Sequence, residues 1–129
     1  MSNGQALRPT DGELEILRVL WQRGPSTVRE VYETIAETKP TGYTTVLKLM
    51  QIMAEKGLVK RDETERAHVY EARAAQEQTQ TQMVSDLVER VFDGSAMKLV
   101  MHALSTKAAS AEELDQIRHI LDEYERGAR

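Results

Sequence analysis

The strongest constraint on the fold is a change of hydrophobic period at Gly57. Apolar residues recur at helical intervals before this glycine, whereas residues 58–61 and 68–71 have the composition of short β-strands. The polar residues 62–66 separate the two runs, and this arrangement is typical of a β-hairpin. The chain is therefore expected to form a helical region that ends in a hairpin.

Two capping boxes predict where the first two helices begin. Thr10 is followed three residues later by Glu13, and Thr27 is followed in the same way by Glu30. In such a box the threonine and glutamate side chains bond each other's backbone amides. The first helix is expected to end at Gly24, where glycine and proline follow each other.

A third helix is expected between Pro40 and Gly57, because the glycine suits a left-handed C-terminal cap. Its apolar residues follow the i, i+3, i+4, i+7 spacing of one helix face. They are Val46, Leu49, Met50 and Met53. Three helices followed by a hairpin are the element order of a winged helix-turn-helix, which we assign to residues 1–75.

Residues 76–129 are expected to be wholly helical, and Ser110 and Glu113 form part of a further capping box. A three-helix segment of 54 residues has little interior in which to bury its apolar stripes, so we expect it to pair with a second copy as a homodimer. The overall class is thus mainly α with a small β-hairpin. The expected dimerisation residues are Val84, Leu87, Val88, Val91, Met97, Val100, Met101, Leu104, Leu114, Ile117, Leu121 and Tyr124.

The charge distribution limits where nucleic acid could bind. The chain has 17 basic and 21 acidic side chains, and residues 1–75 hold 11 of each. An acidic balance disfavours general coating of nucleic acid, but a neutral domain can still concentrate its cations on one face. No apolar run approaches the ~20 residues of a membrane span. The polar first residues also lack a secretory core, so we expect a cytoplasmic protein without membrane insertion.

The sequence offers no constellation for catalysis. It lacks a glycine-rich phosphate loop, a zinc-protease motif and a nucleophile elbow, so we expect no enzyme activity and no cofactor. The absence of cysteine excludes disulfides and thiolate metal sites. Asp115, His119 and Glu123 share one helix face and could touch a cation, but acidic surface helices produce this pattern readily, and no metal site is expected.

Several sequence blocks spread over about residues 8–125 have a familiar pattern. The most specific is Tyr-Thr-Thr-Val-Leu-Lys at residues 43–48, followed by Glu-Lys-Gly-Leu-Val at 55–59. Further matching blocks are residues 14–21, 27–31, 92–95 and 112–118. Together they resemble the penicillinase repressor family, BlaI and MecI, which also includes the CopY copper repressors.

This resemblance implies a dimeric transcriptional repressor with an N-terminal winged helix and a C-terminal dimerisation domain. Its implied partners are double-stranded operator DNA, a second copy, and a membrane sensor-peptidase or other protease that cuts the dimerisation domain near residues 92–106. The first members described carry Asn-Phe at the cleavage junction, where this chain has His102 and Ala103. The copper branch uses cysteines, and their absence here excludes copper sensing of that kind.

The expected DNA contacts lie at the start of the third helix and on the hairpin. A recognition helix enters the major groove with its first turns leading. Threonine and lysine can then contact base edges, whereas cations on a hairpin meet backbone phosphate. The candidate residues are Thr41, Tyr43, Thr44, Thr45 and Lys48 of the helix, with Lys60, Arg61, Arg66 and His68 of the hairpin.

Structural explanations also exist for some of these residues. Thr41 is expected to cap the third helix, Tyr43 can pack beneath its start, and Lys48 can be a solvated side chain. Arg18 and Arg29 are expected to be surface charges paired with neighbouring glutamates. The alternative function is a winged-helix module for protein interaction without specific DNA binding.

Overall fold

The computed structural model describes residues 8–127, which form helices and three short strands. The described chain divides into two compact units, the first ending at Ser85 and the second beginning at Asp86, within one helix. The elements are α2 (Asp11–Arg23), β1 (Ser26–Thr27), α3 (Val28–Ala36), α4 (Tyr43–Lys56), β2 (Val59–Asp62), β3 (Val69–Ala72), α5 (Gln76–Val91), α6 (Ala96–Thr106) and α7 (Ala111–Gly127).

The capping boxes predicted for the first two helices, α2 and α3, are confirmed. The hydroxyl of Thr10 accepts from the Glu13 amide at 3.3 Å, and the Glu13 carboxylate accepts from the Thr10 amide at 3.0 Å. The corresponding distances between Thr27 and Glu30 are 3.2 and 2.9 Å. Each threonine cap contributes about 1 kcal/mol, so α2 and α3 begin at well-defined residues.

The helix α4 begins one residue later than a threonine cap would require. Gly42 is the N-cap residue and makes no side-chain cap hydrogen bond, so the prediction that Thr41 caps this helix is wrong. A capping side chain must sit at the N-cap position to reach the amides of the first turn, and Thr41 lies just outside it. At the other end Gly57 has φ 87° and forms the predicted left-handed cap.

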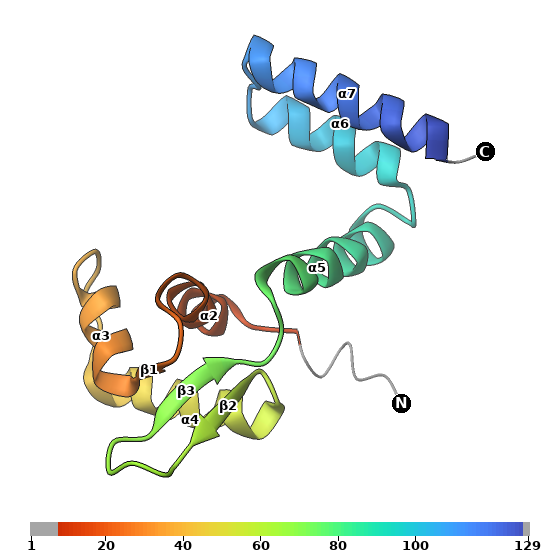
Figure 1. The fold of residues 1–129 in the computed structure, drawn as a ribbon. Helices are drawn as coiled ribbons and strands as arrows, with labels where there is room; N and C mark the ends of the chain where they lie inside the picture. The colour runs from red at the N-terminus through yellow and green to blue at the C-terminus, as the bar shows by residue number, and fades with distance from the viewer. Residues whose placement is uncertain (1–7, 128–129) are drawn as a thin grey trace. The chain divides into compact units, whose positions relative to one another are not determined.

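The three strands form one antiparallel sheet in the order β1-β3-β2. The strands β2 and β3 make the predicted hairpin, each placed one residue later than expected, with Arg61 opposite Tyr70. Figure 1 shows the loop of this hairpin extending beyond the neighbouring helices. The strand β1 was not predicted, because its two residues lie inside a helix-capping segment and carry no alternating pattern.

The hydrophobic core of the first unit joins α2, α3 and α4 to the sheet. The buried side chains in contact are Ile16, Leu17, Val19, Leu20, Val28, Val31, Ile35, Val46, Met50, Met53, Leu58, Val59 and Tyr70. The predicted apolar face of α4 is confirmed, with Leu49 half-buried beside three fully buried residues. This packing fixes which face of α4 remains exposed.

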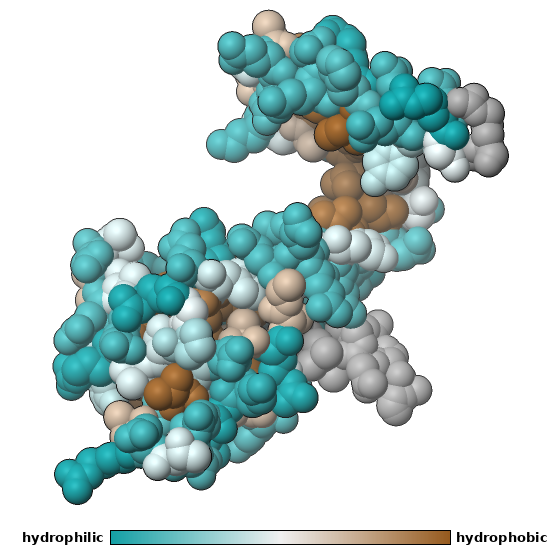
Figure 2. Space-filling model, viewed as in Figure 1, coloured by the Kyte–Doolittle hydropathy of each residue, from teal (hydrophilic) through white to brown (hydrophobic). Residues whose placement is uncertain are grey.

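The helices α5, α6 and α7 contain no buried residue in the part of the chain that the structure describes. Their helical character is as predicted. At the start of α7 the Ser110 hydroxyl accepts from the Glu113 amide at 3.0 Å, but within the described residues the reciprocal bond of the predicted capping box is not formed. Many apolar side chains are exposed, including Met97 at 71% and Tyr124 at 76%. Figure 2 shows brown, hydrophobic side chains at the surface of the part of the chain that holds these helices. None of these helices is apolar and long enough to cross a bilayer, a finding that covers residues 8–127.

Candidate nucleic-acid interface

The first turns of α4 present a polar face to solvent. Tyr43, Thr44, Thr45 and Lys48 are exposed, whereas Val46 on the opposite side is buried. The buried side places α4 against α2 and α3, so the orientation of the exposed face is set by core packing. A helix held in this way can offer hydroxyl, methyl and ammonium groups to a partner without rearranging.

The ring of Tyr43 is in contact with α3 on two sides. It meets the ring of Tyr32 edge to face, with centroids 5.8 Å apart, and the Arg29 guanidinium lies 5.0 Å from its centroid. Arg29 is also 3.8 Å from a carboxylate oxygen of Glu33, which confirms its predicted pairing with a neighbouring glutamate. The tyrosine is still 37% exposed, so it lies both against α3 and at the surface.

The hairpin, which we call the wing (residues 59–72), carries several exposed cations. Arg61 binds Glu63 at 2.7 Å. A hydrogen bond with Tyr70 and the charge of Glu63 raise the pKa of the Arg61 guanidinium. Asp62 accepts from the Thr64 amide at 3.0 Å, and this bond lowers the pKa of the Asp62 carboxyl. Arg61 and Asp62 therefore help to shape the wing itself.

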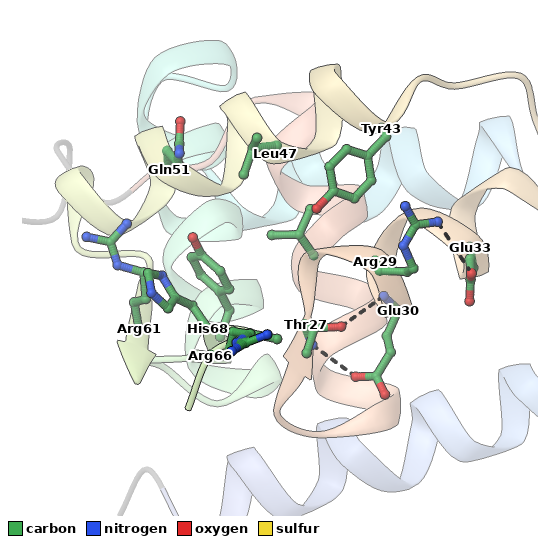
Figure 3. Close-up of a pocket in the computed structure, with 13 residues that line it drawn as sticks. Thr27, Arg29, Glu30, Glu33, Tyr43, Leu47, Gln51, Arg61, Arg66 and His68 are labelled. Carbon is green, nitrogen blue, oxygen red and sulfur yellow. Dashed lines mark hydrogen bonds and ion pairs between the residues drawn. The ribbon is translucent and has the colours of Figure 1, made fainter. Parts of the chain in front are cut away.

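A groove of about 780 Å³ lies between α3, α4 and the wing, and we call it the α3–wing groove. Figure 3 shows that its labelled side chains come from all three elements. Its lining includes Arg29 and Glu33 of α3, Tyr43 and Gln51 of α4, and Arg66 and His68 of the wing.

Only some of the predicted DNA-contact residues line this groove. Tyr43, Arg61, Arg66 and His68 line it, whereas Thr41, Thr44, Thr45, Lys48 and Lys60 do not. Arg29 and Gln51 line it without having been predicted as contacts. Gln51 follows Thr44 by seven residues, so extending the helical period of the exposed face would have found it. The position of Arg29 depends on the packing of α3 against α4 and gives no local sequence signal.

The described residues 8–127 contain no group of three or more side chains suited to hold a metal ion. On α7, the His119 Nδ1 lies 2.9 Å from the backbone oxygen of Asp115 and 3.7 Å from its carboxylate. The histidine thus interacts within its own helix.

Comparison with known proteins places this architecture in a family. The model of the family described as penicillinase repressor matches residues 9–123. The chain belongs to the penicillinase repressor family. Its members are transcriptional regulators, not enzymes, which confirms the expectation that the chain has no enzymatic role.

Relatives from three organisms align with most of the sequence of this penicillinase repressor family member. The transcriptional regulator BlaI of Mycobacterium tuberculosis (strain ATCC 25618 / H37Rv) is 32% identical over 120 residues, covering 90% of this chain and 86% of the relative. The penicillinase repressor of Bacillus licheniformis is 22% identical and covers 89% and 90%. The methicillin resistance regulatory protein MecI of Mammaliicoccus sciuri is 18% identical and covers 88% and 92%.

A solved structure shares the fold. It is the complex structure of hsRosR-S4, with a TM-score of 0.55 and 17% identity, covering 99% of this chain and 100% of that chain. At this identity the likeness concerns the fold alone. It confirms a mainly helical winged helix-turn-helix class with a small antiparallel sheet.

Proposed function

We propose that this protein is a dimeric, sequence-specific DNA-binding repressor that acts in the cytoplasm on an operator. The observation that carries the proposal is the exposed start of α4, where Thr44, Thr45 and Lys48 face solvent while the opposite side of the helix is locked in the core. A helix of this kind fits the major groove, where hydroxyl, methyl and ammonium groups distinguish base edges. Thr41 and Tyr43 lie beside these residues.

Three cations of α4 and the wing that form no ion pair support DNA binding at the same surface. Lys48, Lys60 and Arg66 form no ion pair with any residue in the described range. Outside this surface, Arg18 and Arg73 also form no ion pair with a described residue, so the expected pairing of Arg18 with a neighbouring glutamate is wrong. Unpaired cations on one face allow a domain of zero net charge to attract phosphate.

On the wing, we assign phosphate contacts to Lys60, Arg61, Arg66 and His68. All four side chains are exposed, and Arg61, Arg66 and His68 line the α3–wing groove. Arg61 forms an ion pair with Glu63, so we expect it to contribute less to DNA affinity than Lys60 does. Phosphate contacts of this kind set the position of the protein on the duplex and leave base reading to α4.

We propose a homodimer because α5, α6 and α7 expose most of their apolar side chains. The helix α6 is the clearest case, since Met97, Val100, Met101 and Leu104 are all exposed. A helix with so much apolar surface is normally enclosed by other elements. A second copy supplies the same surface and buries both. We assign DNA binding to residues 1–75 and dimerisation to residues 76–129.

A symmetric dimer places its two α4 helices on half-sites one helical turn, about 34–36 Å, or a multiple of it apart. The operator is therefore expected to have twofold symmetry.

For release from the operator we propose proteolysis near residues 92–106 by a membrane sensor-peptidase or another protease. The candidate junction, His102 and Ala103, lies on α6 and is exposed. Helices without buried residues open locally at low free-energy cost, and a protease needs such opening. Mass spectrometry of the protein from induced cells tests this step, because an intact chain on derepressed DNA contradicts it.

The experiment that tests the function compares duplex DNA from the region upstream of the protein's own gene with scrambled duplex of the same composition. We expect much tighter binding to the upstream duplex and a steep fall in affinity as salt rises. Equal and weak binding to both duplexes contradicts sequence-specific repression. It would favour a role in protein interaction.

A further inference from the structure

Arg29 occupies an unfavourable place in α3. It is the second residue of the helix Val28–Ala36, where the helix dipole disfavours a positive charge. Glu33 follows four residues later, and a basic residue that precedes its acidic partner is the weaker order for such a pair. The stability of α3 therefore gives no reason for an arginine at this position.

The structure holds the Arg29 guanidinium in a defined place. It lies 5.0 Å from the centroid of the Tyr43 ring, a distance typical of a cation–π contact. The Tyr43 ring is itself held by Tyr32. Since Tyr43 is the first residue of α4, this stack ties the guanidinium to the start of the helix that we propose reads DNA.

The hydrogen-bond donors of Arg29 remain available. Its distance of 3.8 Å from the Glu33 carboxylate is longer than a hydrogen bond, so the pair is attracted without engaging a donor. The opposite wall of the α3–wing groove carries Arg66 and His68 (Figure 3). The groove thus has a cationic side chain on each of two walls.

We propose that Arg29 contacts a backbone phosphate of the DNA strand that runs along the α3–wing groove. Tyr43 is the positioning residue that holds Arg29 for this contact. The inference rests on the proposed function, because it assumes that α4 faces DNA. In this proposal, Tyr43 supports DNA binding mainly through its aromatic ring and not through its hydroxyl.

The first test measures the salt dependence of binding for Arg29→Ala with the upstream and scrambled duplexes. Loss of one charge-assisted contact should weaken both by a similar factor, roughly tenfold, and reduce the salt slope by about 0.9. Arg18→Ala is the matched control, since Arg18 is an exposed arginine on α2 outside the groove. An unchanged salt slope for Arg29→Ala overturns the inference.

The second test separates the ring of Tyr43 from its hydroxyl. We expect Tyr43→Phe to keep wild-type affinity and Tyr43→Leu to lose as much as Arg29→Ala. Adding Tyr43→Leu to Arg29→Ala should cause no further loss, because the two residues act through one contact. A loss in Tyr43→Phe equal to that in Tyr43→Leu overturns the positioning role. Circular dichroism and thermal unfolding check that each variant is folded.

A gain in affinity cannot come from misfolding, so Glu33→Gln provides a third test. Removal of this carboxylate takes a negative charge away from the phosphate and from Arg29, and binding should tighten about twofold for both duplexes. Weaker binding in folded Glu33→Gln overturns the inference. If the wild type binds both duplexes equally while Arg29→Ala still lowers the salt slope, the sequence-specific function fails and the Arg29 contact stands.

Discussion

Lys56 Nζ lies 2.7 Å from Glu13 Oε1 and joins the end of α4 to the start of α2. The same carboxylate oxygen accepts the Thr10 amide at 3.0 Å, and Glu13 is only 3% exposed. One buried carboxylate therefore caps α2 and fixes the far end of α4. Since α4 presents the proposed DNA-reading face, this ion pair connects the stability of the domain to the orientation of its binding surface.

Replacing Lys56 with methionine should destabilise the domain. The substitution leaves the buried Glu13 carboxylate without its cation, and we expect a loss of about 1–2 kcal/mol because Lys56 is partly exposed. Urea unfolding followed by circular dichroism measures the effect. Lys48→Met is the control, since Lys48 is exposed on the same helix, and its effect should stay within about 0.5 kcal/mol. Equal effects of the two substitutions contradict the role of this ion pair.

Replacing Thr44 and Thr45 together with alanine should reduce discrimination between operator and scrambled DNA. Loss of recognition at one base pair of a specific site costs about 1–3 kcal/mol, so we expect roughly a tenfold or greater loss in the ratio of affinities. Lys60→Ala should instead weaken binding to both duplexes alike, because a phosphate contact does not depend on sequence. Fluorescence anisotropy with both duplexes measures these ratios. The reverse pattern would show that base reading and phosphate binding have been assigned to the wrong elements.

Replacing Met101 with glutamate should abolish the homodimer. Met101 is 56% exposed on α6, and dimerisation would enclose the introduced charge in an apolar interface. Sedimentation equilibrium should show a dimer for the wild type and a monomer for Met101→Glu. Lys98→Glu introduces the same carboxylate at an exposed polar position of α6, with a larger change in net charge, and should leave the dimer intact. A dimer that survives Met101→Glu would place the interface elsewhere.

The stability that Asp62 gives to the turn of the wing should decrease at acidic pH. Because the Thr64 amide bonds the ionised carboxylate, the folded-state pKa of Asp62 lies below its usual 3.8. The stability that this bond contributes is complete above the unfolded-state pKa and is lost as the pH falls through the folded-state pKa. The difference in unfolding free energy between wild type and Asp62→Asn should therefore be constant above about pH 5 and shrink at lower pH. A difference that grows on acidification contradicts this account.

Local interactions explain what the sequence could predict. The boxes at Thr10 and Thr27 span only three residues, so their partners are visible in the sequence itself. The cap of α4 was misplaced because the backbone angles at Gly42 decide which residue occupies the N-cap position. The strand β1 could not be predicted, because Ser26 pairs with Tyr70, which lies far along the chain.

In the candidate site, too, local features could be predicted from the sequence and contacts between distant residues could not. The exposed threonines of α4 follow from helical period and could be predicted, as could the cations of the wing. The stack of Arg29 on Tyr43 depends on how α3 packs against α4, which the sequence pattern does not specify. The apolar stripes of α5, α6 and α7 were visible in the sequence, and the described part of the chain leaves them without a buried residue.

Hydroxyl-radical footprinting of the full-length protein on the DNA upstream of its own gene tests the central claim most directly. Two copies that each place α4 in a major groove should protect two segments related by twofold symmetry, with centres one helical turn or a multiple of it apart. Thr44→Ala with Thr45→Ala should remove this pattern at the concentration at which the wild type shows it. Uniform protection, or none, at concentrations that bind scrambled DNA equally well would contradict operator recognition by α4.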